Sequence, residues 1–152
     1  MRRGRESRSF SGAWNRLQLC LIPCESFYEP NYETGKPVRW KIGMASGEPL
    51  AIAGLWRVWE EVDVPSAVSF TMLTVNADDH SLMNRFHKLG DEKRSVVIVR
   101  PDAYAGWLGC RSTDEARSFP NLYPVDEMAA EPYPMPPRKT APKSDGDLLA
   151  DA

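Results

Sequence analysis

The stretch Val38-Arg-Trp-Lys-Ile-Gly-Met-Ala-Ser-Gly-Glu-Pro-Leu-Ala-Ile-Ala-Gly-Leu-Trp56 decides the fold, because it holds two strand patterns and the turn between them. Residues 38–44 place apolar side chains at every second position, which predicts a strand buried on one face. Residues 46–49 read Ser-Gly-Glu-Pro, a turn sequence. Residues 50–56 are apolar on both faces, which predicts a central strand. We therefore expect a hairpin here.

The same kind of reading predicts further strands on both sides of this hairpin. Residues 19–22 form a short apolar run that should end at Pro23, and residues 70–75 and 95–99 are rich in β-branched side chains. Short helices are predicted over residues 79–88, from Pro101 to Leu108, and after Ser112, where Glu115 has capping-box spacing. The fold class is α+β: a β-rich mixed sheet or barrel-like fold with a few short peripheral helices.

The length of 152 residues suits one domain. We expect a basic, flexible start over residues 1–9, the folded domain over residues 10–130, and a disordered tail rich in Pro, Lys and Asp over residues 131–152. Five arginines and one acid lie between Met1 and Cys20, so this end either contacts phosphates or is a frayed, solvated terminus.

Composition excludes several classes of protein. The chain is 42% hydrophobic and 26% charged with a net charge of −2, so no global charge calls for nucleic acid or a membrane surface. No apolar run approaches the roughly 20 residues that span a bilayer, and no apolar segment follows the basic start, so we expect no signal peptide. Three cysteines without disulfide spacing fit a reducing compartment. We expect a cytoplasmic protein, monomeric and without membrane contact.

One acid stands out because aromatic side chains precede it. Glu29 follows Phe27 and Tyr28 shortly after the predicted strand that ends at Pro23. An acid beside apolar rings is partly desolvated, which raises its pKa and suits it to proton transfer near neutral pH. The alternative is that the rings pack in the core while Glu29 is an ordinary solvated acid.

A second candidate region runs from Thr74 through Asn76 to two histidines, His80 and His87. Polar residues at a strand end are well placed to meet a ligand, although His87 beside an apolar stripe fits a hydrogen-bonded core histidine equally well. The histidines with Cys20 and Cys24 match no common zinc spacing, so we expect no metal. No glycine-rich phosphate loop is present, and we expect no small-molecule cofactor.

Five motifs follow one another along the chain: Cys20-Leu-Ile-Pro, Phe27-Tyr-Glu29, Ala53-Gly-Leu-Trp56, Thr74-Val-Asn-Ala-Asp78, and His87 ahead of Lys93-Arg-Ser-Val-Val-Ile98. Taken in this order, they resemble the SRAP family, the SOS response-associated peptidases, also known as abasic-site processing proteins. The resemblance covers about residues 10–107.

The resemblance implies a DNA-repair protein of the SOS response that binds single-stranded DNA and crosslinks itself to abasic sites. In the family, a terminal cysteine supplies an α-amine and a thiol that together close a thiazolidine on the sugar aldehyde. A glutamate and a histidine assist ring opening and proton transfer. Glu29 and His87 match these catalytic residues. The expected DNA contacts are Thr74, Asn76, Arg5 and Arg94.

The start of the chain departs from the family pattern. The family begins Met-Cys-Gly-Arg, whereas this chain begins Met1-Arg-Arg-Gly4, and Pro30 stands where a base-stacking tryptophan often follows the glutamate. We therefore expect an N-terminally truncated chain that forms no crosslink as written and whose peptidase and lyase activities are uncertain. Two alternatives stay open: a non-catalytic remnant that binds single-stranded DNA, and a structural domain unrelated to DNA.

Overall fold

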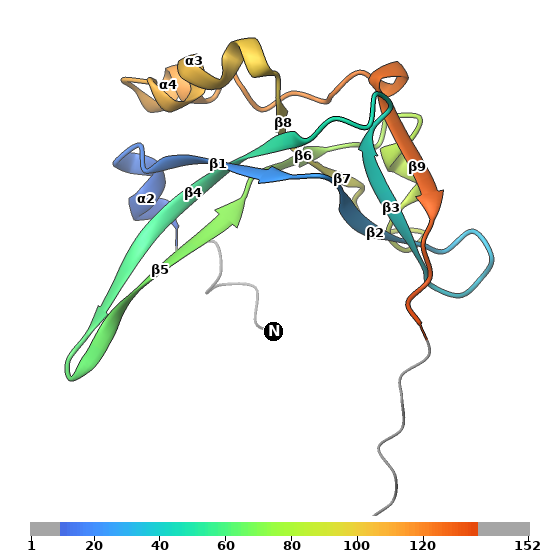
Figure 1. The fold of residues 1–152 in the computed structure, drawn as a ribbon, viewed down its shortest axis with the longest axis horizontal. Coiled ribbons are helices and arrows are strands. Elements are labelled where there is room, and N and C mark those ends of the chain that lie inside the picture. The colour runs from blue at the N-terminus through green and yellow to red at the C-terminus, as the bar shows by residue number, and fades with distance from the viewer. Residues whose placement is uncertain (1–9, 137–152) are drawn as a thin grey trace, which may run out of the picture.

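The computed structural model describes residues 10–136. The strands of this part form three antiparallel sheets, and short helical segments lie at the periphery (Figure 1). The strands do not close into a barrel within these residues, and the α+β class is confirmed. No helix in the described part is long and apolar enough to cross a membrane.

The largest sheet is built around β4, Leu50–Glu61, which is the predicted central strand extended by five residues. On one side it pairs with β1, Leu19–Cys24, and on the other with β5, Val64–Met72, and β8, Ile98–Val99. The prediction that Pro23 ends β1 is wrong, because Pro23 pairs with Ala51 inside the strand. Strand β1 is an edge strand, so the N–H that Pro23 lacks removes no hydrogen bond to a second neighbouring strand.

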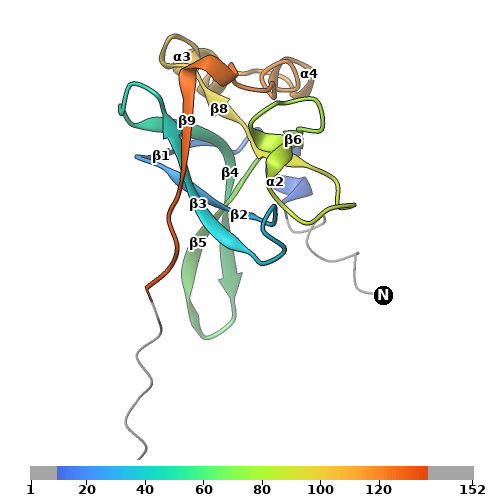
Figure 2. The same ribbon diagram turned by 90° about the vertical axis from the view of Figure 1, so that its right-hand side faces the viewer.

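The second sheet contains β2, Phe27–Asn31, β3, Val38–Met44, and β9, Met128–Pro132, with β3 in the middle (Figure 2). The predicted bounds of β3 are confirmed. The predicted hairpin is wrong, because β3 and β4 belong to different sheets and the turn carries the chain from one to the other. Gly47 has a φ of 78° in that turn, which glycine adopts without steric cost. The expected domain boundary at residue 130 falls inside β9, and the domain division stays a prediction.

A third, two-stranded ladder pairs β6, Thr74–Asn76, with β7, Arg94–Val96. It arises because each predicted strand, 70–75 and 95–99, is divided in two. At the breaks, Leu73 donates its N–H to Ala53, and Val97 donates to Leu73 at 3.0 Å. The chain therefore passes from the large sheet to the small ladder at Leu73 and returns at Val97.

The helical segments are short. They are α2, Ser11–Asn15; η1, Met83–Arg85; η2, Pro101–Ala103; α3, Tyr104–Leu108; α4, Thr113–Ala116; and η3, Val125–Glu127. Pro101 opens a helical run through Leu108 as predicted, and Ser112 caps α4 by accepting the Glu115 N–H at 3.1 Å.

The predicted helix over residues 79–88 is wrong, because only the 3-10 turn η1 forms there. The His80 imidazole accepts the backbone N–H groups of Leu82 and Met83, which competes with helical hydrogen bonding. His87 then leaves the helical region altogether with a φ of 64°.

The two faces of β4 contribute to two different cores. Leu50 and Ile52 belong to a cluster that includes Ile42 and Phe86. Ala53 and Leu55 belong to the other cluster, which is centred on the fully buried residue Trp107 and also contains these residues: Ala13, Leu19, Val97, Val99, Cys110 and Ala116. The indole N–H of Trp107 donates to the Cys20 carbonyl at 2.9 Å and ties α3 to β1.

The outer half of β4 and β5 projects away from both cores as a long hairpin (Figure 1). One face of this arm carries apolar side chains that remain at least 37% exposed: Trp56, Val58, Val68, Phe70 and Met72.

Candidate acid–base site

Strand β2 directs Glu29 toward the interior. Side chains alternate along a strand, so Glu29 shares a face with Phe27, which packs on the first core, and with Asn31, which is buried. Trp40 lies directly opposite on β3. The Glu29 side chain is 18% exposed as a result, so it is not the solvated surface acid of the alternative interpretation.

His87 reaches the same place from a distant turn. Its backbone N–H donates to the Pro30 carbonyl at 2.9 Å, and the neighbouring residue, Phe86, forms an isolated bridge with Asn31. The amide of Asn31 also donates to the Arg85 carbonyl at 3.1 Å. The end of β2 thus fixes the backbone of residues 85–87 against the strand that carries Glu29.

The imidazole of His87 and the carboxylate of Glu29 face each other. The Nε2 atom of His87 lies 3.5 Å from Oε2 of Glu29. This Nε2 is buried and has no hydrogen-bond partner among residues 10–136, while 31% of the side chain remains exposed. Burial raises the pKa of the Glu29 carboxyl, and the charge of His87 opposes part of that rise. The two groups therefore form a partly desolvated pair capable of proton transfer.

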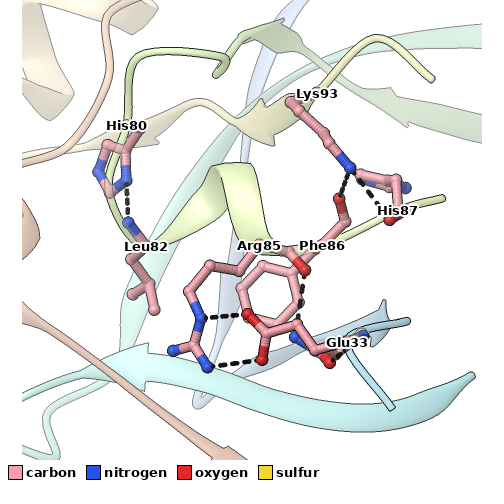
Figure 3. Close-up of polar contacts among 8 residues, drawn as sticks. Glu33, His80, Leu82, Arg85, Phe86, His87 and Lys93 are labelled. Carbon is pink, nitrogen blue, oxygen red and sulfur yellow. Dashed lines mark hydrogen bonds and ion pairs between the residues drawn. The ribbon is translucent and has the colours of Figure 1, made fainter. Parts of the chain in front are cut away.

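Lys93 holds the histidine in its left-handed conformation. Its ammonium donates to three consecutive carbonyls, those of Phe86 at 2.8 Å, His87 at 3.1 Å and Lys88 at 3.0 Å. Figure 3 shows Lys93 reaching the backbone of Phe86 and His87. A non-glycine residue with positive φ costs free energy, and these contacts supply the compensation.

Arg85, the last residue of the η1 turn, forms an ion pair with Glu33. Glu33 accepts two hydrogen bonds from the Arg85 guanidinium, at 2.9 and 3.0 Å (Figure 3). The Arg85 guanidinium also lies 4.9 Å from the centre of the Trp40 ring. Trp40 in turn contacts Phe86 edge to face, so one row of side chains links β3 to the turn.

A cleft of about 560 Å³ opens beside His87. Its size falls within the range of small-molecule pockets. Both acids and bases line the cleft: Tyr32, Glu33, Asp78, Asn84, Arg85, His87, Leu89 and Lys93.

Three of the four predicted DNA contacts lie together on the β6–β7 ladder. Arg94 donates to the hydroxyl and the carbonyl of Thr74, at 2.8 and 2.9 Å, and Asn76 pairs with Arg94 in register. Asp78 accepts hydrogen bonds from the Asn76 amide and the Lys93 N–H, and these hydrogen bonds lower its pKa. Because Asp78 also lines the cleft, it connects this cluster to the cleft. Arg5, the fourth predicted contact, lies outside the described residues.

The other candidate side chains, those of His80 and the three cysteines, are buried or partly buried in the fold. His80 is buried, and since its Nδ1 accepts two N–H groups, its Nε2 donates to the Tyr123 carbonyl at 2.8 Å. Cys20, Cys24 and Cys110 are free thiols whose pKa values burial raises. Within residues 10–136, no group of three or more His, Cys, Asp or Glu side chains is arranged to hold a metal ion.

Sequence reasoning did not single out Asn31, Arg85 or Lys93 as parts of the site. Lys93 lies within a motif that carried the family resemblance, which was the one available signal. Its role depends on three backbone carbonyls converging in a turn, a geometry that residue types alone do not reveal.

Comparison with known proteins extends the similarity over most of the chain. Residues 3–138 match the family described as SOS response associated peptidase (SRAP). A crystal structure of a protein from Bordetella bronchiseptica is 37% identical with a TM-score of 0.78, and the match covers 86% of this chain and 64% of that one. This chain therefore spans less than two thirds of that relative's length.

Two more distant crystal structures share the fold. A protein from Bacteroides thetaiotaomicron is 19% identical with a TM-score of 0.66, and the match covers 74% of this chain and 48% of that one. A phage-related protein from Bordetella bronchiseptica is 17% identical with a TM-score of 0.56, over 82% and 56% of the two chains. No curated protein matches the sequence.

Proposed function

This chain belongs to the SRAP (SOS response associated peptidase) family, and on that premise we propose that it binds single-stranded DNA and acts at abasic sites through Glu29 and His87. The observation that carries the proposal is the position of these two side chains. They lie 58 residues apart in the sequence, 87 minus 29, yet Nε2 and Oε2 are 3.5 Å apart, and His87 lines an open cleft.

The chemistry of an abasic site calls for such a pair. The closed sugar becomes an aldehyde only when its ring oxygen gains a proton and its C1 hydroxyl loses one. A primary amine then condenses with the aldehyde and releases water. A thiol on the same molecule adds to the carbon–nitrogen double bond and passes its proton to the nitrogen, which closes a thiazolidine. Each step needs a proton donor or acceptor close to the sugar.

Glu29 and His87 can fill both roles. Because burial raises the pKa of Glu29, its neutral form persists to higher pH than in an ordinary glutamate, so it can protonate the ring oxygen. Proton exchange between Glu29 and the nearby imidazole then resets the pair after each step. The β6–β7 cluster of Thr74, Asn76 and Arg94 offers polar contacts for the DNA strand, and Arg5 remains a proposed phosphate contact.

The nucleophile requires an amine and a thiol on one residue. Cys20, Cys24 and Cys110 are internal, so their nitrogens are amides that cannot condense with an aldehyde. Cys20 and Cys24 are partly buried and Cys110 is buried, which raises the pKa of all three thiols, so they ionise less readily than ordinary ones. The catalytic pair can nevertheless be tested on the 152-residue chain, because a short peptide such as Cys-Gly-Arg supplies the amine and the thiol in trans.

The test measures how fast Cys-Gly-Arg joins to a single-stranded oligonucleotide that carries one abasic site. We expect the 152-residue protein to accelerate this ligation by at least about tenfold at neutral pH, since positioned acid–base groups typically contribute more than that. Ligation to a double-stranded oligonucleotide with the same abasic site should be accelerated less by the protein. A rate equal to that of peptide and DNA without protein would show that the proposed activity is absent.

A further inference from the structure

The outer face of the β2–β3–β9 sheet carries a cluster of two tyrosines and two cations. Tyr28 immediately precedes Glu29, so strand alternation turns it to the opposite face from the acid–base pair. Arg39 and Lys41 point outward from β3, and Tyr133 follows the end of β9. We call Tyr28, Arg39, Lys41 and Tyr133 the tyrosine–arginine platform.

The platform is ordered by contacts among its own members. The two tyrosine rings lie 5.8 Å apart at an angle of 45°. The guanidinium of Arg39 lies 4.6 Å from the Tyr28 ring and 5.2 Å from the Tyr133 ring, and its Nε donates to the Tyr133 carbonyl at 2.9 Å. Lys41 lies 5.9 Å from the Tyr133 ring. A largely preformed surface results, which reduces the entropy lost when a ligand binds.

Exposure and charge show what this surface could bind. Tyr28 is 45% exposed and Tyr133 is 46% exposed, so both residues are accessible to a ligand. Among the described residues, neither Arg39 nor Lys41 forms an ion pair. The nearest acid by strand register is Glu131, opposite Lys41, and it is exposed. Aromatic faces beside unpaired cations suit a planar base attached to a phosphate.

We propose that the tyrosine–arginine platform binds a base and the adjoining phosphate of single-stranded DNA, at a nucleotide that flanks the one held at Glu29 and His87. This inference rests on the proposed function. Strand β2 is the edge of its sheet, and in the described part of the chain the turn of residues 85–87 covers that edge only at Pro30 and Asn31, so a flexible single strand can pass from the inner face to the outer one at the start of β2. Pro30, on the same outer face as Tyr28, offers no aromatic ring, and the platform supplies two rings beside it.

The test measures binding of a fluorescent, lesion-free single-stranded oligonucleotide to the full chain by anisotropy at several salt concentrations. Tyr133→Leu should weaken binding about fivefold to a hundredfold, the range reported when a stacking aromatic is removed. Arg39→Gln should weaken binding and lower the slope of log K against log salt by about one. Arg117→Gln, which makes the same charge change at the C-terminal cap of α4, should bind within about twofold of wild type.

The outcomes separate the two proposals. If the wild type binds single-stranded DNA and the Tyr133 and Arg39 variants bind equally well, the platform is refuted while the proposed function stands. If the wild type does not bind, both are refuted. If Arg39→Gln fails to fold, Lys41→Gln takes its place, because it leaves the hydrogen bond from Arg39 to Tyr133 intact. The platform predicts weaker binding and a lower salt slope for Lys41→Gln, and wild-type binding by this variant would refute the platform.

Discussion

Replacing Lys93 with methionine should release the turn that carries His87. Methionine keeps most of the apolar stem but loses the ammonium that donates to the carbonyls of Phe86, His87 and Lys88. Two of these hydrogen bonds are partly buried and one is exposed, so the exposed one contributes little. At about 1 kcal/mol for each partly buried bond, the turn should lose about 2 kcal/mol.

That loss should appear first as local opening. The hydrogen bond from the His87 N–H to the Pro30 carbonyl breaks whenever the turn leaves β2, so this amide reports the opening directly. A change of about 2 kcal/mol corresponds to roughly thirtyfold faster exchange of the His87 amide with solvent. Amides of the buried residues Ile52 and Ala53 in β4 should change less, because they exchange only through larger unfolding events.

Lys88→Met is the matched control, because Lys88 is an exposed neighbour whose replacement also removes one positive charge. Its His87 amide should exchange at close to the wild-type rate. Equal exchange in the Lys93 and Lys88 variants would refute the view that Lys93 holds the left-handed turn.

Three further predictions test the site and the packing. The folded state holds the Glu29 proton more tightly than the unfolded chain, so the wild type loses stability as pH rises from the ordinary glutamate pKa through the raised one. Glu29→Gln cannot ionise, so its thermal midpoint relative to wild type should rise across that window in melts from about pH 4 to about pH 8. Ser112→Ala removes the cap of α4 and should cost about 1 kcal/mol in urea unfolding, whereas a cost near zero would mean that the hydrogen bond adds nothing. Phe70→Thr on the exposed face of the arm should cost less than about 1 kcal/mol, whereas Phe86→Ala in the core should cost about 4 kcal/mol; similar costs would contradict the assigned burial.

The sequence predicts the strands whose side-chain pattern matches their surroundings. Residues 38–44 alternate between apolar and other side chains and form β3, a strand of a sheet with one face toward the core. Residues 50–56 are apolar on both faces because β4 separates two cores. The strand β9 was not predicted, because Met-Ala-Ala-Glu-Pro has weak strand propensity and becomes a strand only by pairing with β3.

Errors occurred where one side chain or one distant pairing overrides the local pattern. The helix over residues 79–88 is absent because the His80 ring takes two backbone N–H groups. The hairpin is absent because β3 finds β2 and β9 as neighbours.

The candidate pair could be selected from the sequence only with the help of the family resemblance. The residues alone favoured an ordinary solvated acid at Glu29, and they fitted a core histidine at His87 as well as a functional one. The structure places their side chains 3.5 Å apart and turns His80 into the core instead. Their roles in proton transfer, and the DNA contacts of Thr74, Asn76 and Arg94, remain predictions.

The central claim is that Glu29 and His87 transfer protons at abasic sites, and the most direct measurement compares Glu29→Gln with wild type in the ligation of Cys-Gly-Arg to abasic single-stranded DNA. Glu48→Gln, a substitution of an exposed acid in the turn before β4, serves as the matched control. We predict that Glu48→Gln retains the wild-type acceleration while Glu29→Gln falls to the rate measured without protein, at equal DNA binding. A Glu29→Gln rate equal to that of wild type would contradict the account.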